Sequence, residues 1–479
     1  MRGSTVRTGF ALLLAVLAAL PGLVARYPQM ADYPAHLARW HIMLDQGRSP
    51  WLARYYAIDW HWIPNLGVDL LIGPLAGLFG LTAAGRIVVI AIPLLTGLGL
   101  VAVDRALGRR VGVGTVLAFC TIWSPALLMG FLNFSLAAAL ALLALALWLT
   151  AEGKSWRAPA FVVIAPLLWL CHLSGWAALG VMVFACEWDR RGFLRAIPAT
   201  WPLWPPFALS LLTGSGSAGA LSYGDGVVID KLSNWVKALC DQDFRADLLV
   251  TALLIAVPLV ALGRGRIDWR MGRAALLFAA LSLLLPRHLG GGDFADYRLV
   301  PLALMAWCMA IRWEGPVWLL AVAALPFVGR LAITTVAWER NSQETARILT
   351  ALDRLPPGAR VAGVIAEEGS AWAQPVFTHV HGWAVVRKDA LTNSNFAIPG
   401  VHMLRVRGED PAVFADPAQR IFVRPGERPD LATFPAAARA DWLWYVGPGE
   451  PLRLPDGARV VHRTSHSLLA RLANPPVRR

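Results

Sequence analysis

The chain has 479 residues, of which 57% are apolar and only 16% are charged, so an ordinary water-soluble globule is excluded. The 44 Lys and Arg outnumber the 31 Asp and Glu and give a net charge of +13, but they stand in short clusters between apolar segments. That distribution is typical of membrane topology signals and argues against a nucleic-acid-binding protein.

The first apolar segment, residues 9–25, follows Arg2 and Arg7. No small-residue cleavage site follows it, so we interpret it as a membrane span that runs from the inside to the outside. Ten more spans are predicted from hydropathy. They lie near residues 86–104, 112–129, 131–150, 158–171, 174–187, 196–213, 247–263, 272–286, 298–312 and 316–335.

The apolar stretch at residues 66–81 determines the predicted topology. Counting it as a span would place Arg105, Arg109 and Arg110 outside, against the positive-inside rule. We therefore expect a juxtamembrane or re-entrant helix there. The fold class that follows is a polytopic α-helical membrane protein with about eleven spans, in the inner membrane of a bacterium, with its C-terminus outside. The predicted outer loops are residues 27–85, 130–133, 171–174, 214–246 and 287–297.

The composition changes after Val336, where charged residues, Pro and Gly become frequent and no apolar run is long enough to span. Residues 1–339 are thus predicted to form the membrane module, and residues 340–479 a soluble extracytoplasmic domain. A helix is predicted over residues 344–355. Strands are predicted over residues 360–365, 420–423, 442–446 and 459–462, which indicates a small mixed α/β domain.

The first outer loop holds the most distinctive polar pattern. If a helix begins near Pro34, then Asp32, His36 and Arg39 fall on one stripe at its surface. Such a helix is expected to lie along the membrane surface, with these three side chains directed the same way. The simpler alternative is that Asp32 caps the helix while the other two face solvent.

The same loop continues with Asp59 and His61 close to the next membrane entry. Several acids and histidines at a bilayer surface are suited to a ligand that carries a phosphate or a metal ion. Asp32 and His36 are the candidate ligands for a divalent metal such as Mg²⁺ or Mn²⁺, and the sequence leaves open whether one takes part.

Three features of the chain resemble the GT-C superfamily of membrane glycosyltransferases, in particular the bacterial relatives of the protein mannosyltransferases and the aminoarabinose transferase. They are Asp32 directly after the first span, an outer loop with juxtamembrane helices, and residues 78–86 followed by a span that ends in the basic residues 105–110. The soluble C-terminal domain is also similar. The chain departs from many members in having Asp32-Tyr33-Pro34-Ala35-His36 in place of an Asp-Glu pair.

The resemblance implies that a polyprenyl-phosphate-linked sugar is transferred to a lipid, glycan or protein acceptor at the outer surface, in contact with membrane lipids. Asp32 would be the general base that removes the proton of the acceptor hydroxyl. The leaving lipid phosphate then needs cations, for which Arg287, His288 and Arg298 are candidates within or directly after the predicted outer loop 287–297. Asp296 of this loop is a further candidate for binding the donor or the acceptor. The alternative for this loop is a flexible turn with snorkelling arginines.

His172 is a further candidate for the binding site, because ionisable groups at membrane depth usually face a polar cavity, although a hydrogen bond between packed helices is the simpler explanation.

Two other functions compete with the glycosyltransferase. A transporter or flippase typically has paired halves and charges at the midplane, and no repeat is visible here. A non-catalytic envelope scaffold would use the C-terminal domain for docking.

Overall fold

The computed structural model describes residues 2–212, 221–289, 292–369, 372–397, 402–407, 411–414 and 419–473. The chain divides into two compact units. The helical unit consists of residues 1–24, 62–71 and 86–337, and the sheet unit consists of residues 25–61, 72–85 and 338–479. Each unit is described by itself below.

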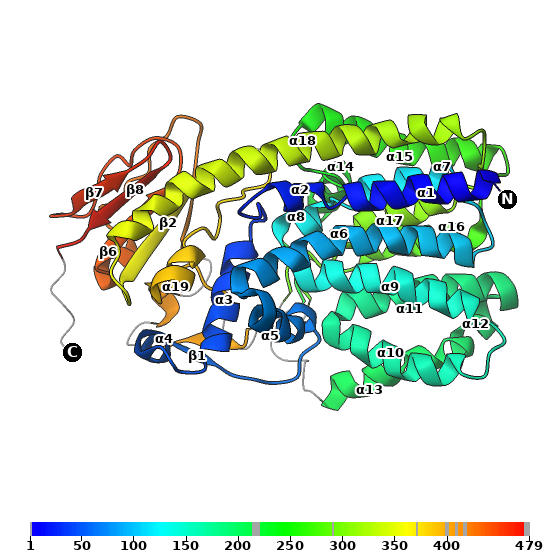
Figure 1. Ribbon diagram of the computed structural model, residues 1–479, viewed down its shortest axis with the longest axis horizontal. Helices are drawn as coiled ribbons and strands as arrows, with labels where there is room; N and C mark the ends of the chain where they lie inside the picture. Colours follow the sequence, from blue (N-terminus) through cyan, green and yellow to red (C-terminus); the bar gives the residue numbers. More distant parts are fainter. Residues whose placement is uncertain are drawn as a thin grey trace. The chain divides into compact units, whose positions relative to one another are not determined.

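Helices make up the helical unit almost entirely (Figure 1). The first half of the chain contains α1 (Arg2–Leu17), α2 (Leu20–Val24), α3 (Tyr33–Asp45), α4 (Pro50–Tyr55), α5 (Gly67–Phe79), α6 (Leu81–Ala106), α7 (Val113–Ala118), α8 (Pro125–Met129), α9 (Leu132–Thr150), α10 (Arg157–Cys171), α11 (Leu173–Arg191), α12 (Phe193–Ala199), α13 (Pro205–Leu212) and α14 (Val227–Val236). The second half contains α15 (Phe244–Gly263), α16 (Trp269–Leu284), α17 (Leu299–Met309), α18 (Trp318–Ile348) and α19 (Gly382–Lys388).

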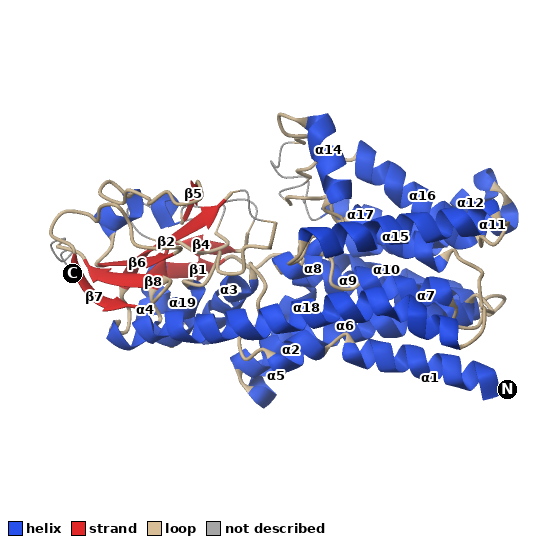
Figure 2. Cartoon of the chain, turned by 90° about the horizontal axis from the view of Figure 1, so that it is seen from above, coloured by secondary structure: helices blue, strands red, loops and turns tan. Residues whose placement is uncertain are grey.

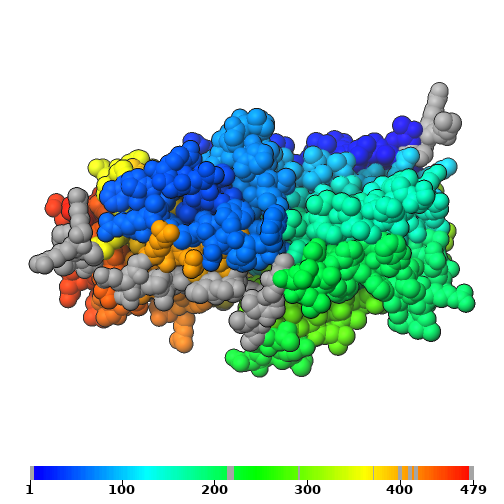
Figure 3. Space-filling view, turned by 90° about the horizontal axis from the view of Figure 1, so that it is seen from below, coloured from blue at the N-terminus to red at the C-terminus, as the bar shows by residue number. Residues whose placement is uncertain are grey.

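Four of the described helices are long and apolar enough to cross a membrane, namely α6, α9, α15 and the continuous helix that starts with α18. Five shorter apolar helical segments accompany them. The helical unit also leaves large apolar side chains exposed, for example Leu194 at 77%, Leu211 at 85% and Leu212 at 82%. Figure 3 shows part of the surface of the helical unit, with the segments beyond about residue 200 in green. Apolar helices with apolar outer surfaces are suited to a lipid environment.

The stretch at residues 66–81 folds as α5, a helix of 13 residues with Pro74 inside it. At about 1.5 Å per residue such a helix rises roughly 20 Å, which is less than the hydrocarbon core of about 30 Å. Its length is therefore that of a juxtamembrane or re-entrant helix rather than of a full span.

The loops between these helices contact one another at the two ends of the helical unit. At one end, the Leu66 amide donates to the Leu170 carbonyl, and the amides of Ser222 and His288 exchange hydrogen bonds with each other's carbonyls. At the other end, the Arg312 amide donates to the Arg266 carbonyl at 2.8 Å. Backbone hydrogen bonds thereby join segments that are far apart in the sequence.

The sheet unit is built on a mixed six-stranded sheet (Figure 2). Its strands are β2 (Arg360–Glu368), β3 (Leu391–Thr392), β5 (Arg420–Val423), β6 (Trp442–Val446), β7 (Arg459–Arg463) and β8 (Ser467–Arg471). The central strand β2 pairs in parallel with β3, β5 and β6, whereas β8 pairs antiparallel with β6 and β7. The four predicted strands are present, and the mixed pairing agrees with a mixed α/β domain.

Residues 25–61 fold as part of the sheet unit, which the sequence analysis did not predict. Strand β1 (Tyr56–Ile58) pairs antiparallel with β4 (Leu404–Val406), and α3 packs against α19. The close approach depends on Gly382, because a Cβ there would lie 2.5 Å from the Pro34 carbonyl oxygen. Ala38 and Ile42 of α3 share a buried apolar cluster with Val385. This packing fixes α3 against the C-terminal part of the chain.

Candidate functional site

The predicted helix after the first span is α3, and Asp32 stands at its N-cap position with Pro34 in the first turn. Within the described chain, the Asp32 carboxylate makes no capping hydrogen bond to α3, so capping does not account for this residue. The predicted apolar stripe is buried, with Tyr33, Leu37 and Trp40 at 0% exposure. Because α3 is buried within the sheet unit, its polar stripe meets other side chains of that unit.

Asp32, His36 and Arg39 meet two histidines from the C-terminal part of the sheet unit. The Nε2 atom of His379 lies 3.8 Å from Oδ1 of Asp32. The ring of Phe396 stands among three imidazoles, with centroids 5.1 Å from His36, 4.9 Å from His379 and 5.5 Å from His402. A guanidinium nitrogen of Arg39 lies 3.4 Å from Nδ1 of His36. We call these six residues the histidine cluster.

Burial determines the charge of the histidine cluster. Arg39 is 5% exposed and His379 is 3% exposed. The loss of hydration lowers the pKa of both His379 and His402 from 6.5 to about 3, and the nearby guanidiniums of Arg420 and Arg39 act in the same direction. At neutral pH both rings are therefore neutral, and the contact between Asp32 and His379 joins a carboxylate to a neutral imidazole.

We expect the sheet unit to lose stability in acid. Between about pH 6.5 and pH 3 the unfolded chain binds protons at His379 and His402 that the folded chain does not. The free energy of unfolding should therefore fall as the pH falls through this window, by up to about 1.4 kcal/mol per pH unit for each histidine. Tryptophan fluorescence and limited proteolysis of the full chain at pH 7, 5 and 4 measure this.

The matched variants are His379→Gln, which should flatten the acid dependence, and His61→Gln, which should leave it unchanged because His61 is exposed. An acid profile of the His379→Gln variant identical to that of the wild type would contradict the assignment of a neutral buried ring.

Asp59 and His61 do not belong to the buried part of the site. Asp59 pairs with Arg405 at 3.4 Å, with side chains 60% and 59% exposed, and its carbonyl contacts Nδ1 of His61 at 2.8 Å. The Asp59 amide also donates to the Met403 carbonyl, next to His402. These two residues are therefore surface groups of the sheet unit near the histidine cluster.

A metal site was considered at Asp32 and His36. In the portion of the chain that the structure describes, no group of three or more His, Cys, Asp and Glu side chains is arranged to hold a metal ion.

The helical unit contains the other predicted residues, and two of them meet directly. Nη1 of Arg298 lies 3.1 Å from Nε2 of His172, and Nη2 donates to the Asp293 carbonyl at 2.9 Å. The guanidinium also stacks on Phe131, with its carbon 4.2 Å from the ring centroid. His172 stands where α10 ends and α11 begins.

The hydrogen bonds of His172 determine what this pair can bind. Its Nδ1 atom accepts a hydrogen bond from the Ser174 amide at 3.0 Å. A guanidinium nitrogen of Arg298 can only donate and lies within hydrogen-bond distance of Nε2, so the two contacts compete for the one acceptor of a neutral ring. What the pair offers a ligand is therefore the fixed positive charge of Arg298, which suits an anionic oxygen.

Arg287 and His288 gather on one carboxylate. Arg287 donates to both oxygens of Asp293 at 2.9 Å and 3.2 Å, and Nδ1 of His288 lies 3.3 Å from the same side chain. All three side chains are 36–44% exposed. In the same loop, Gly292 forms an isolated antiparallel β-bridge with Leu289.

Asp296 is buried and holds a structural ion pair. Its carboxylate lies 2.6 Å from Nζ of Lys231 and accepts a hydrogen bond from Asn234 at 3.0 Å, with both charged side chains under a tenth exposed. Lys231 and Asn234 belong to α14, so this pair fastens α14 to the loop before α17. We therefore assign Asp296 a positioning role.

The sequence analysis missed His379, Phe396 and His402, along with Lys231. The sequence offered one signal, the run of polar side chains from Thr392 to Asn395. In the structure all four of these residues are 0% exposed. A polar run inside a folded domain marks buried hydrogen bonding, but its partners are far away in the sequence.

No known protein family model matches the chain, and no curated protein is similar to it at a significant level.

Proposed function

We propose that this protein is a membrane glycosyltransferase that moves a sugar from a polyprenyl-phosphate carrier to an envelope lipid, glycan or protein acceptor. The observation that carries the proposal is the histidine cluster, where Asp32 stands beside a buried neutral imidazole at 3.8 Å. A carboxylate that is partly accessible, with its side chain 20% exposed, and that lies beside buried polar side chains is suited to take a proton from an acceptor hydroxyl.

In the proposed reaction the acceptor oxygen attacks the anomeric carbon of the sugar, and the bond between that carbon and the carrier phosphate oxygen breaks. The proton of the acceptor hydroxyl passes to the Asp32 carboxylate, and the bonding electrons leave with the phosphate. Arg298, beside His172, would stabilise the phosphate, because its guanidinium carries a fixed positive charge.

The topology belongs to the same proposal: about eleven spans, with the C-terminal domain and the outer loops outside an inner membrane. Its support is that the loops assigned to one side contact one another. His172 and Arg298 join two predicted outer loops, and Arg266 and Arg312 join two predicted inner segments. Cysteine labelling of intact cells tests this arrangement. The Ser222→Cys variant, whose cysteine the proposal places outside, should be labelled, whereas the Arg312→Cys variant, with its cysteine on the inner side, should not.

Replacing Arg298 by Gln should raise the donor concentration needed for half-maximal rate by about 10–100-fold, because a charge-assisted contact to phosphate is lost. Steady-state rates of polyprenyl-phosphate release at varied donor concentration measure it. The matched control is Arg245→Gln, since Arg245 is an exposed arginine on the same unit. If the Arg298→Gln and Arg245→Gln variants needed the same donor concentration for half-maximal rate, Arg298 would be excluded from donor binding.

The function itself is tested with purified protein in vesicles that contain a polyprenyl-phosphate sugar. Release of polyprenyl phosphate together with a glycosylated product is the expected result, and envelope glycans from cells with and without the gene should differ by the same sugar. Accumulation of substrate inside sealed vesicles without a covalent product would instead identify a transporter.

A further inference from the structure

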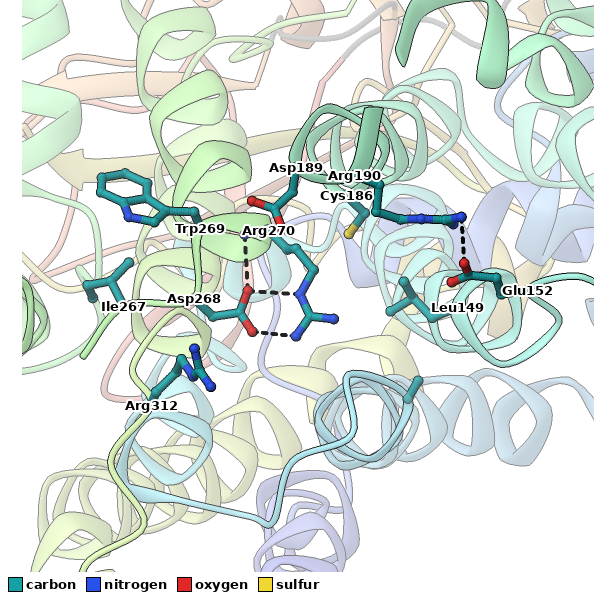
Figure 4. A pocket seen from close by; sticks show the side chains of 11 residues that line it. Leu149, Glu152, Cys186, Asp189, Arg190, Ile267, Asp268, Trp269, Arg270 and Arg312 are labelled. Carbon is teal, nitrogen blue, oxygen red and sulfur yellow. Dashed lines mark hydrogen bonds and ion pairs between the residues drawn. The ribbon is translucent and has the colours of Figure 1, made fainter. Parts of the chain in front are cut away.

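A cavity of about 340 Å³ opens in the helical unit, at the other end of the helices from His172 (Figure 4). Its walls come from the ends of α6, α9 and α11, the start of α16 and the segment after α17. Helix α11 has 19 residues and rises about 28 Å, so the cavity and the His172 end are separated by nearly the thickness of a hydrocarbon core. The cavity is thus independent of the site described above.

Charged side chains line much of this cavity, and each of its carboxylates is already paired with an arginine. Asp268 binds Arg270 through two hydrogen bonds of 2.9 Å and 2.7 Å, and Glu152 pairs with Arg190 at 2.5 Å (Figure 4). The third carboxylate, on Asp189, pairs with Arg273. The acidic groups of the wall are therefore neutralised by the protein itself.

Arg312 carries a positive charge that takes part in none of these ion pairs. Its side chain lines the cavity, and within the described ranges no carboxylate lies within ion-pair distance of its guanidinium. Arg264 and Arg266 stand nearby, with their guanidinium carbons 5.9 Å and 5.8 Å from the ring centroid of Trp313, the next residue. Arg312 therefore adds a positive charge to a wall whose acidic groups are already paired.

The size of the cavity restricts the ligand. A volume of about 340 Å³ is at the lower end of the roughly 300–1,000 Å³ that small-molecule sites occupy. Arginine forks bind phosphate oxygens in pairs, and Trp269 adds an aromatic wall. A compact phosphate-bearing group fits both the volume and the charge.

We propose that this cavity binds the phosphate of a small organic phosphate through Arg312. The phosphate belongs either to a phospholipid headgroup, which enters from the bilayer, or to a soluble phosphate ester. Both present the same anion, and they differ in the acyl chains attached to it.

Native mass spectrometry of the detergent-purified full chain tests the proposal with two probes, dioctanoyl phosphatidylglycerol and glycerol 3-phosphate. Saturable binding of at least one probe is expected for the wild type. Arg312→Gln should weaken it by about tenfold or more, whereas Arg312→Lys should retain part of it. Binding of the lipid alone identifies a headgroup site, and equal binding of both identifies a soluble phosphate ester.

The matched control is Arg195→Gln, because Arg195 is exposed and does not line the cavity. A second variant, Leu149→Trp, fills the cavity from the end of α9 and should also abolish binding without removing a charge. Arg312 is exposed, so its replacement leaves the fold intact. The proposal is overturned if neither probe binds the wild type, or if Arg312→Gln binds as tightly as Arg195→Gln.

Discussion

Asp32→Asn should lower the turnover number by about 100- to 10,000-fold, the usual contribution of a general base. The amide has the shape of the carboxylate but does not take up the proton of the acceptor hydroxyl. The Asp32 side chain does not cap α3, so the helix should form as before. Single-turnover rates of polyprenyl-phosphate release, measured at saturating donor, isolate the chemical step from donor binding.

Asp59→Asn is the matched control, because Asp59 lies in the same loop region with its side chain 60% exposed. It should turn over at the wild-type rate, and both variants should elute and melt as the wild type does. Normal turnover by Asp32→Asn would rule out Asp32 as the base. Inactivity of the wild type itself would instead reject the proposed function as a whole.

Arg330→Ala should destabilise the helical unit by about 3–5 kcal/mol, the usual cost of breaking a buried ion pair from one side. Nε of Arg330 donates to Asp247 at 3.0 Å, and both side chains are about 5% exposed or less. The remaining guanidinium nitrogens donate to the carbonyls of Cys120 at 2.8 Å and Leu239 at 2.7 Å. Removing the guanidinium therefore affects three segments, and denaturant unfolding in mixed micelles measures the loss.

The control on the same helix is Arg340→Ala, which should change the unfolding midpoint little because Arg340 is exposed. A double variant, Arg330→Met with Asp247→Leu, should recover much of the stability, since no charge then remains buried without its partner. Equal midpoints for Arg330→Ala and Arg340→Ala would show that the pair contributes nothing.

The helices and strands were predictable because their signals are local. Leucine- and alanine-rich runs give helices such as α9, and the continuous run of aromatic and apolar residues 442–446 gives β6 in the sheet unit. The short length of α5 also follows from the sequence, because residues 66–81 hold too few apolar positions for a long helix. The number of membrane spans was not predictable from hydropathy in the same way, because several of the predicted spans fold as helices that are shorter than a bilayer requires.

The composition of the candidate sites was only partly predictable. The i, i+4 and i+7 spacing of Asp32, His36 and Arg39 predicted a shared stripe on one helix, and α3 presents them together. The partner His379 lies more than 340 residues away from this stripe, on a segment without a recognisable motif. Asp296 was predicted to bind substrate, yet its partner Lys231 places it in a buried structural pair.

The amino-acid sequence by itself determined the environment of this protein and the identity of its secondary structure, because hydropathy and periodicity act within a few turns of chain. Only the tertiary structure decided that α3 is buried in the sheet unit, that three imidazoles surround Phe396, and that Arg312 faces a cavity whose acids are already paired. These arrangements depend on contacts between segments that are distant in the sequence. The burial that such contacts create is also what sets the protonation of His379 and His402, and no local pattern contains it.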